Sequence, residues 1–198
     1  MDLNDPTAVA TLAAEAFERA GHLYALYGGL LVAAYGEPRE TRDADFAVVD
    51  LTLAEAARVL RNAGVETQSA FESVRFGGLL ISRLTLLGSA SFSGLNTIAL
   101  VRPRSARYAA EAVSRSVAGP LLGRSVRVLS IEDFLLFKAL STRERDLEDA
   151  ASALRRSRGL ADTAWIDSEL RLLADEIPDV DVKSRYVRIC ELARTASS

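Results

Sequence analysis

The sequence predicts an α/β (α+β) protein in which helices flank a mixed β-sheet and a helical bundle follows at the C-terminus. Three observations predict this class. Short apolar runs alternate with helical segments over residues 1–129, two of these runs are joined as in a hairpin, and every signal from residue 130 onward is helical. We therefore expect an α/β domain over residues 1–129 and a helical part over residues 130–198 that packs directly on it.

The chain should begin with a helix, a strand and a short second helix. Asp5 and Pro6 are typical of an N-cap and a first helical residue, and apolar residues then repeat at helical spacing up to Gly21. Residues 22–27 are a short apolar run that suits a strand. Residues 30–35 suit a short buried helix.

The next elements are a turn, a strand and a capped helix. Gly28-Gly29 lies between the first strand and the short helix, so we expect a strand-to-helix turn there. Residues 43–49 alternate into a β-branched run, which predicts the second strand. Thr52 and Glu55 have the spacing of a capping box, and they predict a helix that closes at Gly64.

The middle of the chain supplies the remaining strands. Residues 79–87 and 95–101 are apolar, and a Gly/Ser-rich stretch separates them as in an antiparallel hairpin. Residues 105–117 have a helical pattern, and residues 126–129 form a brief apolar strand. Since a hairpin is antiparallel, whereas strands joined through a helix are commonly parallel, we expect a mixed sheet.

The C-terminal third has only helical signals. Ser130 and Asp133 again have capping-box spacing. Breaks between helices are expected near Ser141, at Gly159 and at Pro178.

Composition excludes several classes of site. The chain has one histidine, His22, and one cysteine, Cys190. A histidine-based metal centre, a Ser/His/Asp triad and an internal disulfide are therefore not expected. No run of eighteen apolar residues and no secretory leader is present, so we expect a cytoplasmic protein with no membrane partner.

Charge is unevenly distributed along the chain. Residues 73–131 hold eight arginines against the single acid Glu111, whereas the segments on either side are net acidic. This basic segment either attracts phosphates or only solvates helix and strand faces. Attraction of phosphates would favour RNA as a partner, with binding that falls as salt rises.

Two aspartates open the second predicted strand. Positions two apart in a strand face the same side, so Asp43 and Asp45 should project together. Such a pair suits Mg²⁺, which takes one or two carboxylates together with substrate phosphates. Gly28 and Gly29 would let phosphate approach the backbone at a helix N-terminus. The alternatives are a solvated strand end and an ordinary tight turn.

Two segments resemble the nucleotidyltransferase superfamily. The first is Tyr27-Gly28-Gly29 followed by Gly36-x-Pro38-Arg39-x-Thr41-Arg42-Asp43-x-Asp45-Phe46. The second is the run SIEDFLLFK over residues 130–138, followed by Arg143-x-Arg145-Asp146-Leu147-x-Asp149. They are most similar to the AbiEii-like toxins of type IV toxin–antitoxin systems and to their bacterial relatives. The two motifs span the chain from about residue 24 to residue 150.

The resemblance implies a nucleotidyltransferase fold and Mg²⁺-dependent transfer of a nucleotide from a nucleoside triphosphate, ATP among them, to an acceptor hydroxyl. The acceptor would be tRNA or another RNA, a protein or a small molecule, and an antitoxin protein would be a partner. The implied roles are as follows: metal binding at a two-metal site by Asp43 and Asp45, phosphate binding by Gly28, Gly29 and Lys138, loop support by Arg39 or Thr41, and a place in the same cleft for Asp146. For Lys138 the alternative is a snorkelling helix residue, and for Asp146 it is a salt bridge to Arg143 or Arg145.

One feature of the family pattern has no counterpart. The family has a third carboxylate on a later strand, but no Asp or Glu lies between Glu72 and Glu111. By the order of elements, Ala99 stands in that position, with Thr85 as the second choice. Three explanations remain open: a family member that binds nucleotide without turnover, an engineered inactive variant, or an acid supplied from elsewhere, such as Glu72 or Asp146.

Overall fold

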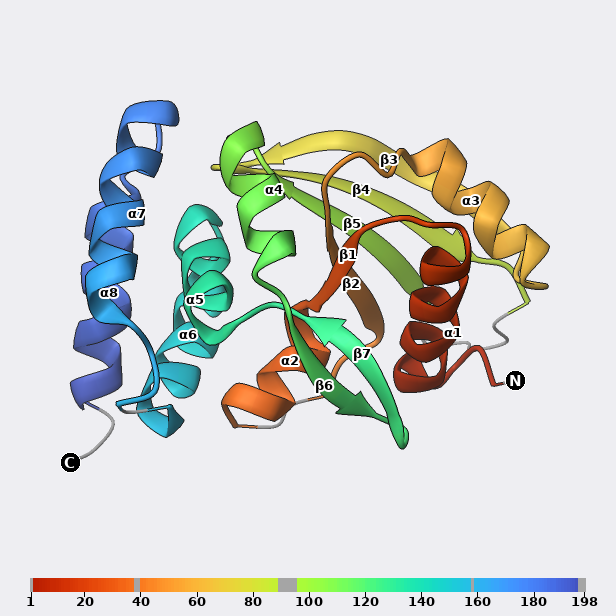
Figure 1. Ribbon diagram of the computed structural model, residues 1–198, viewed down its shortest axis with the longest axis horizontal. Helices are drawn as coiled ribbons and strands as arrows, with labels where there is room; N and C mark the ends of the chain where they lie inside the picture. The colour runs from red at the N-terminus through yellow and green to blue at the C-terminus, as the bar shows by residue number, and fades with distance from the viewer. Residues whose placement is uncertain (1, 38–39, 89–95, 158, 196–198) are drawn as a thin grey trace.

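A computed structural model describes residues 2–37, 40–88, 96–157 and 159–195, and its centre is a seven-stranded mixed sheet (Figure 1). The strands are β1 (Tyr24–Tyr27), β2 (Asp43–Val48), β3 (Thr67–Phe76), β4 (Leu79–Leu86), β5 (Thr97–Pro103), β6 (Val117–Leu121) and β7 (Arg124–Val128). The helices are α1 (Pro6–Arg19), α2 (Gly28–Tyr35), α3 (Leu53–Asn62), α4 (Ala106–Ser114), α5 (Ile131–Leu140), α6 (Glu144–Arg156), α7 (Thr163–Glu176) and α8 (Val182–Thr195).

The strand order is β3-β4-β5-β2-β1-β7-β6, which places β2 and β1 near the middle of the sheet. β2 runs parallel to β5 and antiparallel to β1, while β1 runs parallel to β7. The expected mixed sheet is therefore confirmed, and so is the antiparallel pairing of β4 with β5. The Gly/Ser-rich stretch expected to join those two strands lies largely outside the described residues.

Aromatic side chains hold β1 and β2 on both faces. On one face, the ring of Phe17 from α1 lies 6.1 Å from Tyr24 and 5.3 Å from Phe46. On the other face, Phe137 from α5 lies 5.2 Å from Tyr27. Successive strand residues alternate between faces, so Asp45, the neighbour of Phe46, projects toward the α5 side. This packing fixes which face of the sheet carries the aspartates.

Most local predictions from the sequence are confirmed. Asp5 caps α1 through its side chain, and Thr52 and Glu55 form the expected capping box at α3. Ser130 caps α5 by accepting a hydrogen bond from the backbone of Asp133. The expected helix breaks also occur, because α5 ends before Ser141, α6 before Gly159 and α7 before Pro178.

The two edge strands were not predicted. β3 is mostly exposed and contains register shifts on either side of Phe71, so it has no apolar alternation. β6 contains Gly119 and Pro120, which are tolerated at an edge but do not signal a strand. The predicted helix over residues 105–117 was accordingly too long, since α4 ends at Ser114 and Val117 begins β6.

The basic segment is largely used inside the protein. Arg104 pairs with Asp179, and Arg107 pairs with Glu169 and Glu176, so β5 and α4 are tied to α7 and the turn after it. Four further arginines of the segment pair with acids: Arg75 with Asp179, Arg83 with Asp43, Arg115 with Asp133, and Arg124 with Glu15. Most arginines of the segment are therefore paired with acids and do not merely solvate helix and strand faces.

The C-terminal helices lie together beyond one side of the sheet, and α1 and α3 lie at the other side (Figure 1). α6 contacts both α5 and α8, and it also contacts α2. Among the described helices, none combines the length and the apolar character that a membrane crossing requires.

Candidate active site

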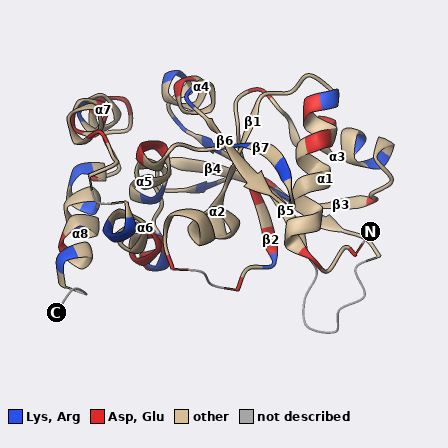
Figure 2. Ribbon diagram, turned by 60° about the horizontal axis from the view of Figure 1, so that its bottom comes forward, with Lys and Arg blue, Asp and Glu red and all other residues tan. Residues whose placement is uncertain are grey.

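A cavity of about 190 Å³ lies between the strands β1, β2 and β4 and the helices α5 and α6. Its lining residues are Tyr27, Gly28, Gly29, Thr41, Asp43, Asp45, Arg83, Lys138, Arg143, Arg145 and Asp146. The fold therefore brings together all of the site residues expected from the sequence except Arg39, which lies outside the described residues. Figure 2 shows the acidic positions of β2 beside α2, which carries no charged residue.

The two aspartates line the same cavity but have different surroundings. Asp43 accepts a 2.7 Å hydrogen bond from the hydroxyl of Thr97 on β5, and it lies 3.8 Å from the guanidinium of Arg83. Burial and the negative charge of Asp43 raise the pKa of Asp45 to about 6, against the attraction of Lys138 and Arg83. The carboxyl of Asp45 is therefore harder to ionise here than in water, mainly because it is buried.

Close packing explains why glycines precede the aspartates. Gly28 has a φ of +72°, and a Cβ placed there would lie 1.9 Å from Oδ2 and 2.7 Å from Cβ of Asp45. A Cβ on Gly29 would lie 2.6 Å from the hydroxyl oxygen of Thr41. Glycine is thus needed at positions 28 and 29 because any larger residue would collide with the side chains of Asp45 and Thr41. Because Tyr27 makes no side-chain cap to α2, the helix N-terminus is also left for an anion.

Lys138 is buried within an ion cluster. Its side chain is only 2% exposed, and its Nζ donates to Asp146 at 2.6 Å and to Asp149 at 2.9 Å. The snorkelling alternative is therefore wrong. Burial alone would raise the pKa of Asp146, but the charges of Lys138 and Arg143 lower it below its usual value. The predicted salt bridge from Arg143 to Asp146 is present at 3.0 Å.

Two buried donors at the cavity have no hydrogen-bond partner in the described part of the chain. They are the hydroxyl of Tyr27 and the Nε of Arg83. Burial raises the pKa of Tyr27 well above its usual value, so its hydroxyl stays protonated and can donate. Neither donor was predicted from the sequence, because Arg83 was one arginine among eight and Tyr27, although part of the first motif, was assigned no role.

The donor set fits one divalent cation with a polyphosphate. Two carboxylates line the same cavity as the N-terminus of α2 and the basic residues Arg83 and Arg143, which suits oxygen ligation of Mg²⁺ together with phosphate oxygens. The carboxylates among the described lining residues are Asp43, Asp45 and Asp146, and Asp146 is paired with Lys138. A second metal would therefore have no carboxylate of its own, so the residues present do not fit a two-metal site.

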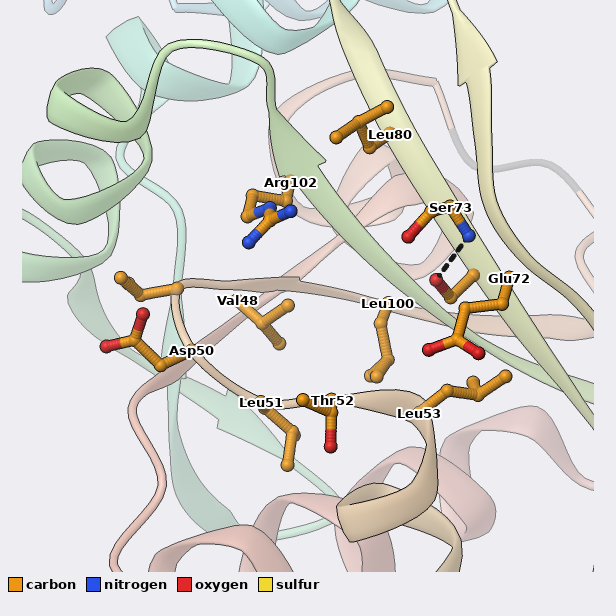
Figure 3. A pocket seen from close by; sticks show the side chains of 12 residues that line it. Val48, Asp50, Leu51, Thr52, Leu53, Glu72, Ser73, Leu80, Leu100 and Arg102 are labelled. Carbon is orange, nitrogen blue, oxygen red and sulfur yellow. Dashed lines mark hydrogen bonds between the residues drawn. The ribbon is translucent and has the colours of Figure 1, made fainter.

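The structure limits which residues could supply the third carboxylate. Ala99 is directly opposite Asp45 in the parallel pair of β5 with β2, which agrees with its expected position. Glu72 cannot replace it, because it lines a separate cavity of about 100 Å³ together with Leu100 and Arg102 (Figure 3). Leu100 and Ala99 are successive strand residues, so this second cavity is on the opposite face of the sheet. Asp146 does reach the site, but it is engaged by Lys138.

Replacing Asp45 with asparagine is expected to stabilise the metal-free protein at pH 7.5 by about 1–2 kcal/mol, because asparagine carries no charge to desolvate and water still reaches part of the Asp45 side chain. The folded pKa of about 6 exceeds the usual value, so the folded state binds more protons and the wild type loses stability as pH rises between about 4 and 6. Urea unfolding in EDTA at pH 7.5 and pH 4 measures the difference, which should vanish at pH 4. Asp50→Asn, at an exposed position, is the matched control. An Asp45→Asn variant that is less stable than the wild type at pH 7.5 would contradict this prediction.

No family model matches this sequence, and a search of curated proteins finds no match. Solved structures do resemble it. A nucleotidyltransferase-like antigenic protein from Paracoccidioides brasiliensis aligns with a TM-score of 0.53 and 20% identity, over 94% of this chain and 93% of that one. The solution structure of the antibiotic-resistance factor ANT(2'')-Ia aligns with a TM-score of 0.51 and 14% identity, over 94% and 97%.

A crystal structure of ANT(2'')-Ia in complex with adenylyl-2''-tobramycin aligns with a TM-score of 0.50 and 16% identity, over 91% of this chain and 98% of that one. At such identities the likeness shows the fold alone. The fold class expected from the sequence, a nucleotidyltransferase-type mixed sheet flanked by helices, is confirmed.

Proposed function

We propose that this protein binds a nucleoside triphosphate with Mg²⁺ and transfers a nucleotide to an acceptor hydroxyl. One observation carries the proposal: Asp43 and Asp45 share a single cavity with the N-terminus of α2 and with basic side chains from three other elements. The cavity is smaller than the roughly 300–1,000 Å³ of most ligand pockets. We therefore expect it to hold the cation and the phosphates, with the base outside it.

The proposed roles follow from position and charge. Asp43 and Asp45 would hold Mg²⁺, which when bound neutralises charge on the phosphates. Tyr27 would donate a hydrogen bond from its protonated hydroxyl to a phosphate oxygen, and Arg143 would add positive charge at the cavity. In the reaction the acceptor oxygen bonds to the α-phosphorus and the bond to pyrophosphate breaks. Pyrophosphate leaves with the bonding electrons, and the hydroxyl proton passes to water.

Lys138 has a more specific proposed role. Two of its three donors are used by Asp146 and Asp149, so its position is fixed before any ligand arrives. Asp146 thus contributes to the site by positioning Lys138. The third N–H donor of Lys138 would therefore act on phosphate from a fixed point, which suits transition-state stabilisation.

Transfer is expected to fall at least a hundredfold, to order of magnitude, when Asp45 is replaced by asparagine, because a metal ligand is lost. The test incubates the protein with each α-labelled nucleoside triphosphate, Mg²⁺ and, separately, total RNA, protein extract and an aminoglycoside. Glu72→Gln is the matched control, since it removes a carboxylate from the other face of the sheet and should leave transfer unchanged. Transfer that persists in Asp45→Asn would refute the proposed site.

A second candidate is nucleotide binding without transfer. It is favoured by Ala99, which stands opposite Asp45 where the family has an acid. Calorimetry with a triphosphate and Mg²⁺ separates the two functions. Tight binding that depends on Asp45, with no labelled product from any acceptor, would establish the second candidate.

The acceptor and the biological role remain proposals. Because six of the eight arginines of the basic segment pair with acids, that segment gives little support to an RNA or tRNA acceptor. The ANT(2'')-Ia complex shows that a protein of similar fold binds an adenylylated aminoglycoside, which favours including small molecules in the test. The AbiEii-like resemblance adds a toxin with an antitoxin partner. Growth arrest by the wild type but not by Asp45→Asn would support that role.

A further inference from the structure

Three neighbouring strands place Asp45, Ala99 and Arg83 in one row across the sheet. Asp45 on β2 is opposite Ala99 on β5, and Ala99 is opposite Arg83 on β4. Residues directly opposite one another in adjacent strands share a face, so all three project toward the cavity. The position of the absent carboxylate is thus flanked by an acid on one side and by a base on the other.

The guanidinium of Arg83 is held in place but is not saturated. It lies 5.4 Å from the ring centroid of Phe71, and its Nη2 lies 3.8 Å from Oδ2 of Asp43. A distance of 3.8 Å is too long for a hydrogen bond, so this contact is an ion pair only. The buried Nε of Arg83 has no partner in the described residues. Arg83 therefore lines the cavity with a guanidinium whose buried Nε has no partner there.

Arginine and a second metal are alternative ways to place the same charge. An aspartate with a divalent cation adds one positive charge to the site, and alanine with arginine also adds one. The planar guanidinium also matches the geometry of phosphate oxygens, and arginines stabilise charge in phosphoryl transfer. Ala99 and the neighbouring Arg83 thus form one consistent arrangement.

We propose that Arg83 takes the place of the second metal ion, so that the site binds one divalent cation per nucleoside triphosphate and Arg83 donates hydrogen bonds to its phosphates. The inference rests on the proposed nucleotide site. It assigns to that site a single cation, held by Asp43 and Asp45, and a phosphate-binding residue that belongs to neither sequence motif.

The direct test counts cations. Mn²⁺ replaces Mg²⁺, and electron paramagnetic resonance titrates bound Mn²⁺ at a saturating concentration of α,β-methylene ATP, which is not cleaved at the transferred phosphate. The expected result is a total of one Mn²⁺ per complex of protein and nucleotide, because Asp43, Asp45 and the phosphates would share the same ion. Two Mn²⁺ per chain in the wild type would overturn the inference.

Variants test the role of the guanidinium. Arg83→Gln should weaken binding of the analogue by about tenfold or more, as expected for loss of a charge-assisted hydrogen bond, and Arg83→Lys should lose part of that affinity. Arg102→Gln is the matched control, because Arg102 is on β5 and lines the cavity on the opposite face. Circular dichroism checks folding. Unchanged affinity in a folded Arg83→Gln would overturn the inference.

A designed exchange gives the sharpest outcome. Ala99→Asp alone should leave the count at one Mn²⁺, because the new carboxylate would pair with Arg83. Ala99→Asp combined with Arg83→Gln should bind two Mn²⁺ per chain, and a count of one in this double variant would contradict the exchange. If the wild type binds no analogue at all, the proposed function fails together with this inference. If the wild type binds it with two Mn²⁺, this inference alone fails.

Discussion

Replacing Lys138 with methionine is expected to lower the free energy of unfolding by about 3–5 kcal/mol, because it leaves buried carboxylates without their cation. Asp146 and Asp149 are 5% and 6% exposed, so water cannot take over the role of the ammonium. Typical domains are stable by only about 5–15 kcal/mol, so much of the protein's stability would be lost. Urea unfolding at pH 7.5 measures the change.

Two further variants identify the cause of the loss. Lys183→Met removes the other lysine, which is exposed on α8, and it should change stability by no more than about 0.5 kcal/mol. Lys138→Met combined with Asp149→Asn removes one charge of each sign and leaves Asp146 with Arg143, so it should recover part of the loss. A single Lys138→Met variant as stable as Lys183→Met would show that the ion cluster does not form as described.

Replacing Gly28 with alanine is expected to destabilise the protein by more than 2 kcal/mol, to order of magnitude, and to abolish Mn²⁺ binding at the site. The added Cβ would lie 2.7 Å from the Cβ of Asp45, and that atom cannot be moved by side-chain rotation. The backbone of β1 or β2 must shift instead, which displaces the aspartate. Thermal unfolding and Mn²⁺ titration measure the two effects.

Gly21→Ala separates backbone strain from the clash. Gly21 has a φ of +77°, close to the +72° of Gly28, but a Cβ there would have no heavy atom within 4 Å. Its cost should be only the penalty for the left-handed conformation, about 1–2 kcal/mol, with Mn²⁺ binding unchanged. Equal losses in the two variants would mean that the contact between Gly28 and Asp45 carries no weight.

Local features were predictable because their causes are local. The caps at Asp5, Thr52 and Ser130 depend on residues no more than three positions away, and the shared face of Asp43 and Asp45 follows from strand alternation. The edge strands were missed for the converse reason. β3 and β6 are held by pairing with a neighbouring strand and bury little apolar surface, so their sequences contain no period to detect.

The sequence by itself determined the order of most elements, the mixed sheet, and the meeting of a glycine turn with two aspartates. Only the tertiary structure decided that Lys138 is buried between two acids and that Arg83 stands beside Ala99. It also decided that most arginines of the basic segment form ion pairs within the protein. These outcomes depend on the register of β4, β5 and β2 and on the packing of α5 against α6. Register and packing join residues far apart in the chain, and no local spacing encodes them.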